Sequence, residues 1–142
     1  EKYTAAVFEP AIKQRPGVIY IPGLSSEDAH AVISQSFALV NSSDSEGMCL
    51  AILEAMHLGT PILARDCPGN RAIVDDGTTG YLFHSPQTFL EKAEKLVHNN
   101  IIYRNMTRNA MEYVHSYHNL ERERQAYSDL MKLCVKDIEA GI

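Results

Sequence analysis

The 142-residue sequence contains no apolar run close to the roughly 20 residues that a membrane-spanning helix needs. It has no G-x-x-x-x-G-K-[ST], no G-x-G-x-x-G and no G-x-S-x-G motif, which are the patterns of P-loop ATPases, of the common dinucleotide-binding turn and of the hydrolase nucleophile elbow. Internal repeats and low-complexity linkers are absent as well. The sequence therefore gives no support to a membrane span or to those three chemistries.

Basic residues and cysteines are both few. The 13 Lys and Arg against 18 Asp and Glu give a net charge of -5, which argues against nucleic acid as the main partner, because its binders usually present a basic face. Cys49, Cys67 and Cys134 are widely spaced without a C-x-x-C pair, which favours reduced thiols in a cytoplasmic protein over disulfides or a zinc site. His115 and His118 lack an H-E-x-x-H motif, so we interpret them as a surface pair and expect no metal.

The length and the composition predict one globular domain. Apolar residues make up 45% of the chain and charged residues 22%, as in ordinary soluble proteins. The chain opens with EKYTAAVFEP, without an initiator Met or a signal-peptide pattern, which is typical of a fragment. We expect a single, partial domain over residues 1–142, with C-terminal helices from about residue 86 to residue 138.

Short apolar runs alternate with helical patterns. Ser25 or Ser26 is expected to cap a first helix, and Gly59-Thr60-Pro61 is expected to stop a second one. This alternation predicts an α/β fold, a doubly wound parallel sheet flanked by helices. The strands are expected at Val18–Ile21, Phe37–Val40, Pro61–Ala64 and Tyr81–Phe83, with a short helix at Arg71–Asp75.

An acid interrupts the most apolar helical stretch. A helix beginning near Gly47 would be apolar nearly all round, so it should be buried, and Glu54 with it. A buried carboxylate needs hydrogen-bond donors or a positive partner. Two plainer interpretations stay open: Glu54 is a structural acid satisfied by protein groups, or it faces solvent. Glu46 lies eight residues earlier, about 12 Å along a helix, which is too far for the two carboxyl groups of a glycoside hydrolase.

The region between the two acids suits a phosphate. Free amides and the positive dipole end at a helix start attract anions, and Gly47 permits close approach to the backbone. An acid, a phosphate-binding helix start and a second acid match the sugar, the diphosphate and the ribose of a nucleotide sugar. In doubly wound sheets such ligands lie at the carboxyl ends of strands, where residues 41–46 should emerge.

The stretches NSSDSEGMCLAILEAMHLGTPILA and GNRAIVDDGTTGYLF resemble the donor-binding domain of retaining glycosyltransferases of the group-1 type. The resemblance runs from about Gly17 to Tyr117, and Glu46-x7-Glu54 matches the paired-glutamate motif of that family. It implies the C-terminal Rossmann-like domain of the two-domain GT-B fold, without its first two strands. It also implies a glycosyltransferase that takes its sugar from a nucleotide-sugar substrate, without a metal or another cofactor.

The resemblance assigns roles to individual residues. Glu46 would be the catalytic-site acid on the donor sugar, and Glu54 would hold the ribose hydroxyls. Ser43 matches a family serine, although a loop hydroxyl that caps the next helix is an equal alternative. Backbone amides for the sugar and the phosphates would come from Gly47, Met48, Cys49 and Leu50.

Departures from the family pattern keep other functions open. Met48 and Cys49 stand where members usually have an aromatic residue and a second glycine, and Ala72 stands where many carry a glutamate. The basic residues for the diphosphate and the acceptor domain would belong to a missing N-terminal half. The alternatives are a non-catalytic nucleotide-sugar-binding or interaction domain and, less favoured, a nucleotide-sugar epimerase. Because missing strands leave open sheet edges, we also expect rearranged strand pairing or a homodimer. The acceptor stays unknown.

Overall fold

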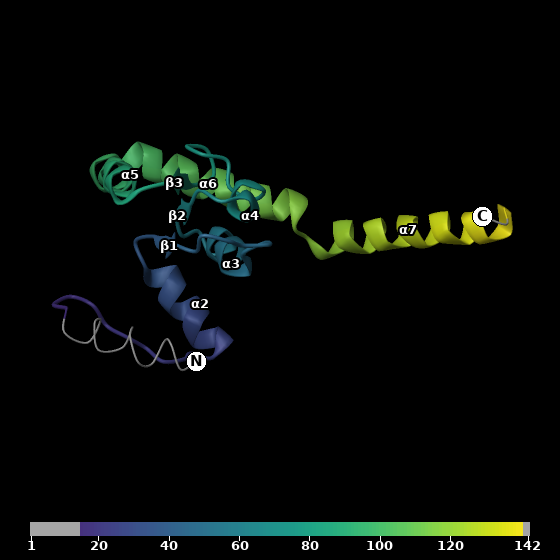
Figure 1. The fold of residues 1–142 in the computed structure, drawn as a ribbon, viewed down its shortest axis with the longest axis horizontal. Coiled ribbons are helices and arrows are strands. Elements are labelled where there is room, and N and C mark those ends of the chain that lie inside the picture. The colour runs from purple at the N-terminus through teal and green to yellow at the C-terminus, as the bar shows by residue number, and fades with distance from the viewer. Residues whose placement is uncertain (1–14, 141–142) are drawn as a thin grey trace.

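The computed structural model describes residues 15–140, and its centre is a parallel sheet (Figure 1). The described part has three strands, β1 (Leu39–Asn41), β2 (Ile62–Arg65) and β3 (Tyr81–Phe83), in the order β1-β2-β3. Leu63 of β2 is opposite Val40 on one side and Tyr81 on the other. The expected α/β fold with a parallel sheet flanked by helices is confirmed.

Helices connect and follow the strands. Their starts have local causes: Ser25 accepts a hydrogen bond from the Asp28 amide at 3.1 Å, Ser85 and Thr88 form a capping box, and Asn99 caps the helix after it. The helices are α2 (Ser26–Gln35), α3 (Leu50–His57), α4 (Pro68–Arg71), α5 (Pro86–His98), α6 (Asn100–Tyr117) and α7 (Leu120–Ala140).

The strand prediction is right for three of the four runs. The last has the expected bounds, and the two before it are displaced by one or two residues. Val18–Ile21 is wrong, because this segment pairs with none of the strands in residues 15–140, and a strand needs a hydrogen-bonded neighbour. Ile19 is 86% exposed. Rearranged pairing of this segment is therefore also wrong within the described residues, whereas a homodimer through a sheet edge stays a prediction.

The predicted helix at Arg71–Asp75 is wrong as well, because α4 begins and ends earlier. Pro68 occupies the first turn, where its missing N–H costs nothing, and Cys67 precedes it in an extended conformation. The predicted stop of α3 is confirmed: Gly59 has φ 77°, a left-handed conformation that favours glycine.

Two apolar clusters cover the two faces of the sheet. Because side chains alternate along a strand, Ile62 and Ala64 of β2 enter one cluster and Leu63 enters the other. Helix α6 contributes to both, through Ala110 to the first and Met106 to the second. The first cluster also contains the buried side of α3: Ile52, Leu53, Ala55 and Met56.

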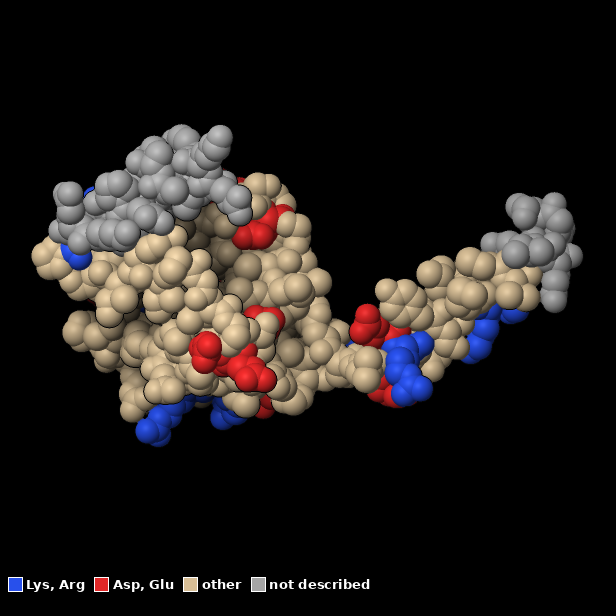
Figure 2. All heavy atoms as spheres, turned by 90° about the horizontal axis from the view of Figure 1, so that it is seen from below, with Lys and Arg blue, Asp and Glu red and all other residues tan. Residues whose placement is uncertain are grey.

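Helix α7 projects from the rest of the described chain (Figure 1). Its apolar side chains are exposed, Tyr127 by 63% and Met131 by 63%. Figure 2 shows both signs of charge on this helix, while Asp and Glu gather on the visible face of the body. Among the described residues, no helix combines the length and the apolarity that crossing a membrane requires.

The packing of α5 gives a matched stability prediction. Leu96 is 1% exposed, whereas Leu90 on the same helix is 53% exposed. Leu96→Ala should lower the free energy of unfolding by about 2–5 kcal/mol, because it leaves a cavity in the core. Leu90→Ala should change it by about 0.5 kcal/mol or less. Urea unfolding followed by circular dichroism measures both, and equal losses would show that α5 does not pack as described.

Candidate functional site

The expected site lies in the loop of residues 42–49, which leaves the carboxyl end of β1 and leads into α3. The helix begins at Leu50, with Cys49 as its extended N-cap residue, so the predicted start near Gly47 is wrong. Glu46 therefore lies in the loop and Glu54 in the helix, and the 12 Å helical spacing does not apply to them. Hydrogen bonds from Asn41 account for the later start, since they hold the loop in a non-helical path.

Glu46 is half-buried and faces hydrogen-bond donors. The Asn41 amide nitrogen donates to Glu46 Oε1 at 3.2 Å. Hydrogen bonds from the side chains of Ser43 and Asn41 hold the pKa of Glu46 below its ordinary value. At neutral pH this group is therefore a carboxylate that accepts hydrogen bonds. Ser43 does not cap α3, since the N-cap residue is Cys49.

The backbone that carries Glu46 rests on Gly69 of α4. A Cβ added at Gly69 would lie 2.1 Å from the carbonyl oxygen of Glu46 and 2.5 Å from that of Gly47. Only glycine permits this approach, because neither contact is with a movable side chain. Gly47 itself is open, since a Cβ there would meet nothing within 4 Å.

The residues that follow Gly47 divide between the core and the surface. The Cys49 thiol is buried and accepts a hydrogen bond from the Asn41 amide nitrogen at 3.2 Å. Its side chain therefore points inward and leaves the outer side of the helix start free. Met48 and Leu50 are exposed, by 51% and 63%. The start of α3 is accessible from outside.

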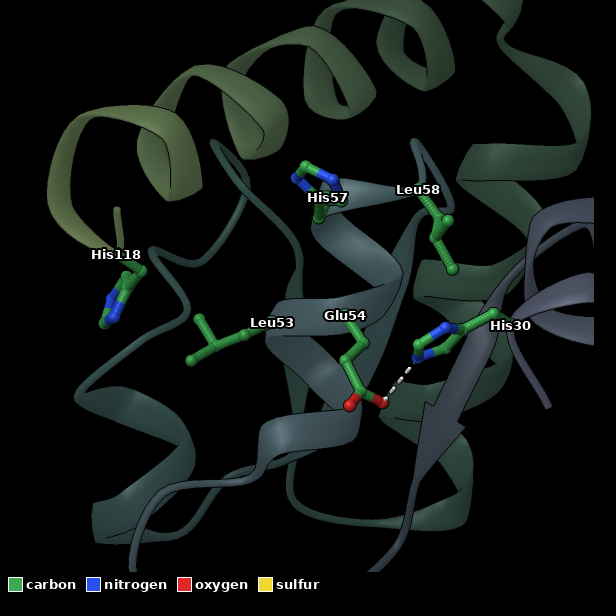
Figure 3. A pocket seen from close by; sticks show the side chains of 6 residues that line it. All are labelled: His30, Leu53, Glu54, His57, Leu58 and His118. Atoms are coloured by element: carbon green, nitrogen blue, oxygen red, sulfur yellow. Dashed lines mark ion pairs between the residues drawn. The ribbon is translucent and has the colours of Figure 1, made fainter. Parts of the chain in front are cut away.

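Glu54 is not buried, so that prediction is wrong and the interpretation that it faces solvent is right. Helix α3 buries only one side, and Ala51, Glu54 and His57 follow one another at three-residue spacing on the open side. The Glu54 side chain is 47% exposed and its Oε2 lies 3.5 Å from His30 Nε2 of α2. Figure 3 shows these two side chains pointing toward one another across a pocket of about 270 Å³. The pocket is lined by His30, Leu53, Glu54, His57, Leu58 and His118.

A second hollow of about 510 Å³ adjoins the start of α3. Its lining includes Met48 and Leu50 as well as Arg122 at the start of α7. The Arg122 guanidinium lies over the Tyr117 ring, 4.8 Å from its centroid. The hollow thus brings a cation to the same part of the molecule as the loop amides.

Several residues of this region escaped prediction from the sequence, whereas Asn41 was expected only as the start of the segment that emerges from a strand. Arg65 ends β2, where ligand sites of parallel sheets form, so its position after an apolar run was a usable signal, and Asn70 lies in the helix that follows. Nothing in the sequence pointed to His30 or Arg122. Within residues 15–136, no group of three or more His, Cys, Asp or Glu side chains is arranged to hold a metal ion.

Residues 11–113 match the family described as "Glycosyl transferases group 1". The Glycosyltransferase 1 domain-containing protein 1 of Xenopus tropicalis is 46% identical over 123 residues, which are 87% of this chain and 36% of that protein. The chain thus spans about a third of the length of this relative. The resemblance to group-1 glycosyltransferases stated from the sequence is confirmed.

Solved structures are similar in fold. The C-terminal domain of the glycosyl transferase group 1 family protein LpcC from Francisella tularensis has a TM-score of 0.63 at 22% identity, covering 72% of this chain and 53% of that one. A mutant of TarM from S. aureus, in complex with Fondaparinux, alpha-GlcNAc-glycerol and UDP, has a TM-score of 0.70 at 22% identity, covering 80% of this chain and 23% of that one. The fold is that of the C-terminal domain of GT-B glycosyltransferases.

The contact of Gly69 with the loop gives a prediction. Gly69→Ala should lower the free energy of unfolding by about 1–3 kcal/mol, because the loop backbone has to move away. The amide resonances of Glu46 and Gly47 should shift most. Gly23→Ala is the control, since a Cβ there meets nothing within 4 Å. Chemical unfolding and two-dimensional NMR measure these effects, and a Gly69→Ala chain as unaffected as the control would contradict the contact.

Proposed function

The chain belongs to the glycosyl transferase group 1 family, and from this premise we propose that it binds the nucleotide-sugar donor of a retaining glycosyltransferase. The observation that carries the proposal is the placement of Glu46. Hydrogen bonds hold it as a carboxylate in the loop between the carboxyl end of β1 and the start of α3.

Glu46 would accept hydrogen bonds from hydroxyls of the donor sugar. Sugar hydroxyls are donors, and a carboxylate accepts strong, charge-assisted bonds from them. One oxygen of Glu46 is engaged by Asn41, which turns the group in a fixed direction. Its role would be to position the donor at the reacting bond.

The start of α3 would hold the diphosphate. The amides of Gly47, Met48, Cys49 and Leu50 precede the helix or open it, where unpaired N–H groups and the helix dipole attract anions. The inward thiol of Cys49 supports this role despite the missing family glycine. Arg122 lines the hollow beside these residues and would add a positive charge.

Glu54 would bind the ribose. Its pocket lies on the open side of α3, beyond the helix start that follows the loop. A donor that extends along the helix from the loop would reach this pocket. A carboxylate with accessible oxygens can accept from both ribose hydroxyls. His30 would keep Glu54 turned toward this pocket.

A nucleotide-sugar-binding domain without turnover is the second candidate. The observation that favours it is the pairing of Arg65, whose guanidinium lies 3.0 Å from Asp44, so this cation at the end of β2 would have to leave that carboxylate to bind a diphosphate. An activity assay with the full-length protein and a nucleotide-sugar donor distinguishes the two functions. A transferase should transfer the sugar or hydrolyse the donor, whereas a binding domain should do neither. With donor alone, a nucleotide sugar of changed configuration would indicate an epimerase, whereas free sugar and free nucleotide would indicate hydrolysis by a transferase.

A titration followed by NMR tests donor binding by this chain. UDP and a UDP-sugar are the first ligands, since UDP is present in the TarM structure. We expect resonance shifts centred on residues 46–54. Glu54→Ala should weaken the binding about tenfold, because a charge-assisted hydrogen bond is lost.

Glu91→Ala is the matched control, because Glu91 is an exposed acid of α5 whose carboxylate accepts a hydrogen bond from Gln87 on the same helix. It should bind the ligands as the wild type does. Shifts scattered over the surface, or equal weakening by both substitutions, would count against a donor site at α3.

A further inference from the structure

Side-chain amides connect the end of β2 to Glu46 in a continuous chain. The Asn70 amide nitrogen donates to the Arg65 carbonyl at 2.9 Å and to Asn41 Oδ1 at 3.2 Å. The Asn41 amide nitrogen in turn donates to Glu46 Oε1 at 3.2 Å. Asn70 is therefore connected to Glu46 through Asn41.

Backbone groups fix the direction of this chain at both amides. The Arg65 carbonyl can only accept a hydrogen bond, so the nitrogen of Asn70 has to face it. The Ser43 backbone N–H can only donate, and it donates to Asn41 Oδ1 at 3.2 Å, so the oxygen of Asn41 faces the loop backbone. As a result Asn41 presents its N–H groups, and not its oxygen, to Glu46.

Asn70 is completely buried, which is unusual for an amide side chain. Its Oδ1 has no hydrogen-bond partner within the described part of the chain. Filling space does not explain such a residue, because an apolar side chain would fill it without an unsatisfied acceptor. The two bonds that its nitrogen donates do explain it.

We propose that Asn70 is a positioning residue that acts through Asn41 to hold Glu46 as an oriented acceptor for the donor sugar. The reference to the sugar rests on the proposed function, whereas the hydrogen-bond chain is a property of the protein alone. Hydrogen bonds from Ser43 and Asn41 lower the pKa of Glu46. The neighbouring charged groups, Asp44 and Arg65, pair with each other.

The test measures the pH at which the Glu46 carboxyl titrates, by carbon-detected NMR of the 142-residue chain, with Glu46→Gln to assign the resonance. In Asn41→Ala this midpoint should shift upward, toward the ordinary value of a glutamate, because one donor is lost. In Asn70→Ala it should shift in the same direction but by less, because Asn41 Oδ1 then keeps only the Ser43 N–H and the amide is held less firmly. A merely structural role of Asn70 would not move it.

Asn109→Ala is the matched control, since Asn109 also bonds a distant carbonyl, that of Thr78, at 3.3 Å, but takes no part in the chain. It should leave the midpoint unchanged. Asn70→Leu provides a second variant that fills the buried space, should the alanine variant not fold. The proposal is overturned when a folded Asn70 variant titrates at the wild-type midpoint while Asn41→Ala does not.

The affinity of the same variants for UDP-glucose, measured by titration, distinguishes a failure of this inference from a failure of the proposed function. With donor binding in the wild type, Asn70→Ala should weaken it about tenfold, by the loss of one oriented charge-assisted bond. Unchanged affinity in that variant would contradict the role toward the sugar. If the wild type does not bind, the proposed function fails, while a shifted midpoint still supports the positioning of Glu46.

Discussion

The burial of strand β2 on both faces is the constraint on which the rest of the structure depends. Its first three residues, Ile62, Leu63 and Ala64, are almost fully buried, and neighbouring strands take its hydrogen bonds on both edges. Each face then needs its own apolar cover, because the side chains alternate. Helix α3 supplies part of one cover and α5 part of the other, so the positions of both helices follow from this strand.

The same constraint determines where polar groups can gather. Polar side chains in the middle of the sheet would be buried without hydrogen-bond partners. They occur instead at the strand ends, with Asn41 as the last residue of β1 and Arg65 as the last residue of β2. At that edge the loop of residues 42–49 passes over α4, and Gly69 allows the two backbones to touch. The site therefore forms where the strands end, and its acid, Glu46, accepts a hydrogen bond from Asn41 at the end of β1.

The sequence predicted the parts of this arrangement that depend on local pattern. Apolar runs located β2 and β3, and the Ser25 cap and the stop at Gly59 followed from residue type. The prediction of a strand at Val18–Ile21 was wrong because an apolar pattern does not reveal whether a neighbouring strand is present to pair with it. The predicted burial of Glu54 was wrong because an apolar composition does not tell which side of a short helix is covered. The hydrogen bonds of Asn70 were out of reach, since they join elements that meet only in the folded chain.

The spacing of Glu46 and Glu54 pointed to the family, yet the structure changes what that spacing means. The two acids do not share a helix, since one belongs to a loop held by Asn41 and the other to the open side of α3. Their relative placement therefore depends on the angle at which the loop enters the helix, and at that entry the inward thiol of Cys49 accepts a hydrogen bond from Asn41. The eight-residue spacing of Glu46 and Glu54 therefore fixes their separation in space only through tertiary contacts: the Asn41 amide bonds Glu46 and Cys49 before α3, and the core packs against the buried side of the helix.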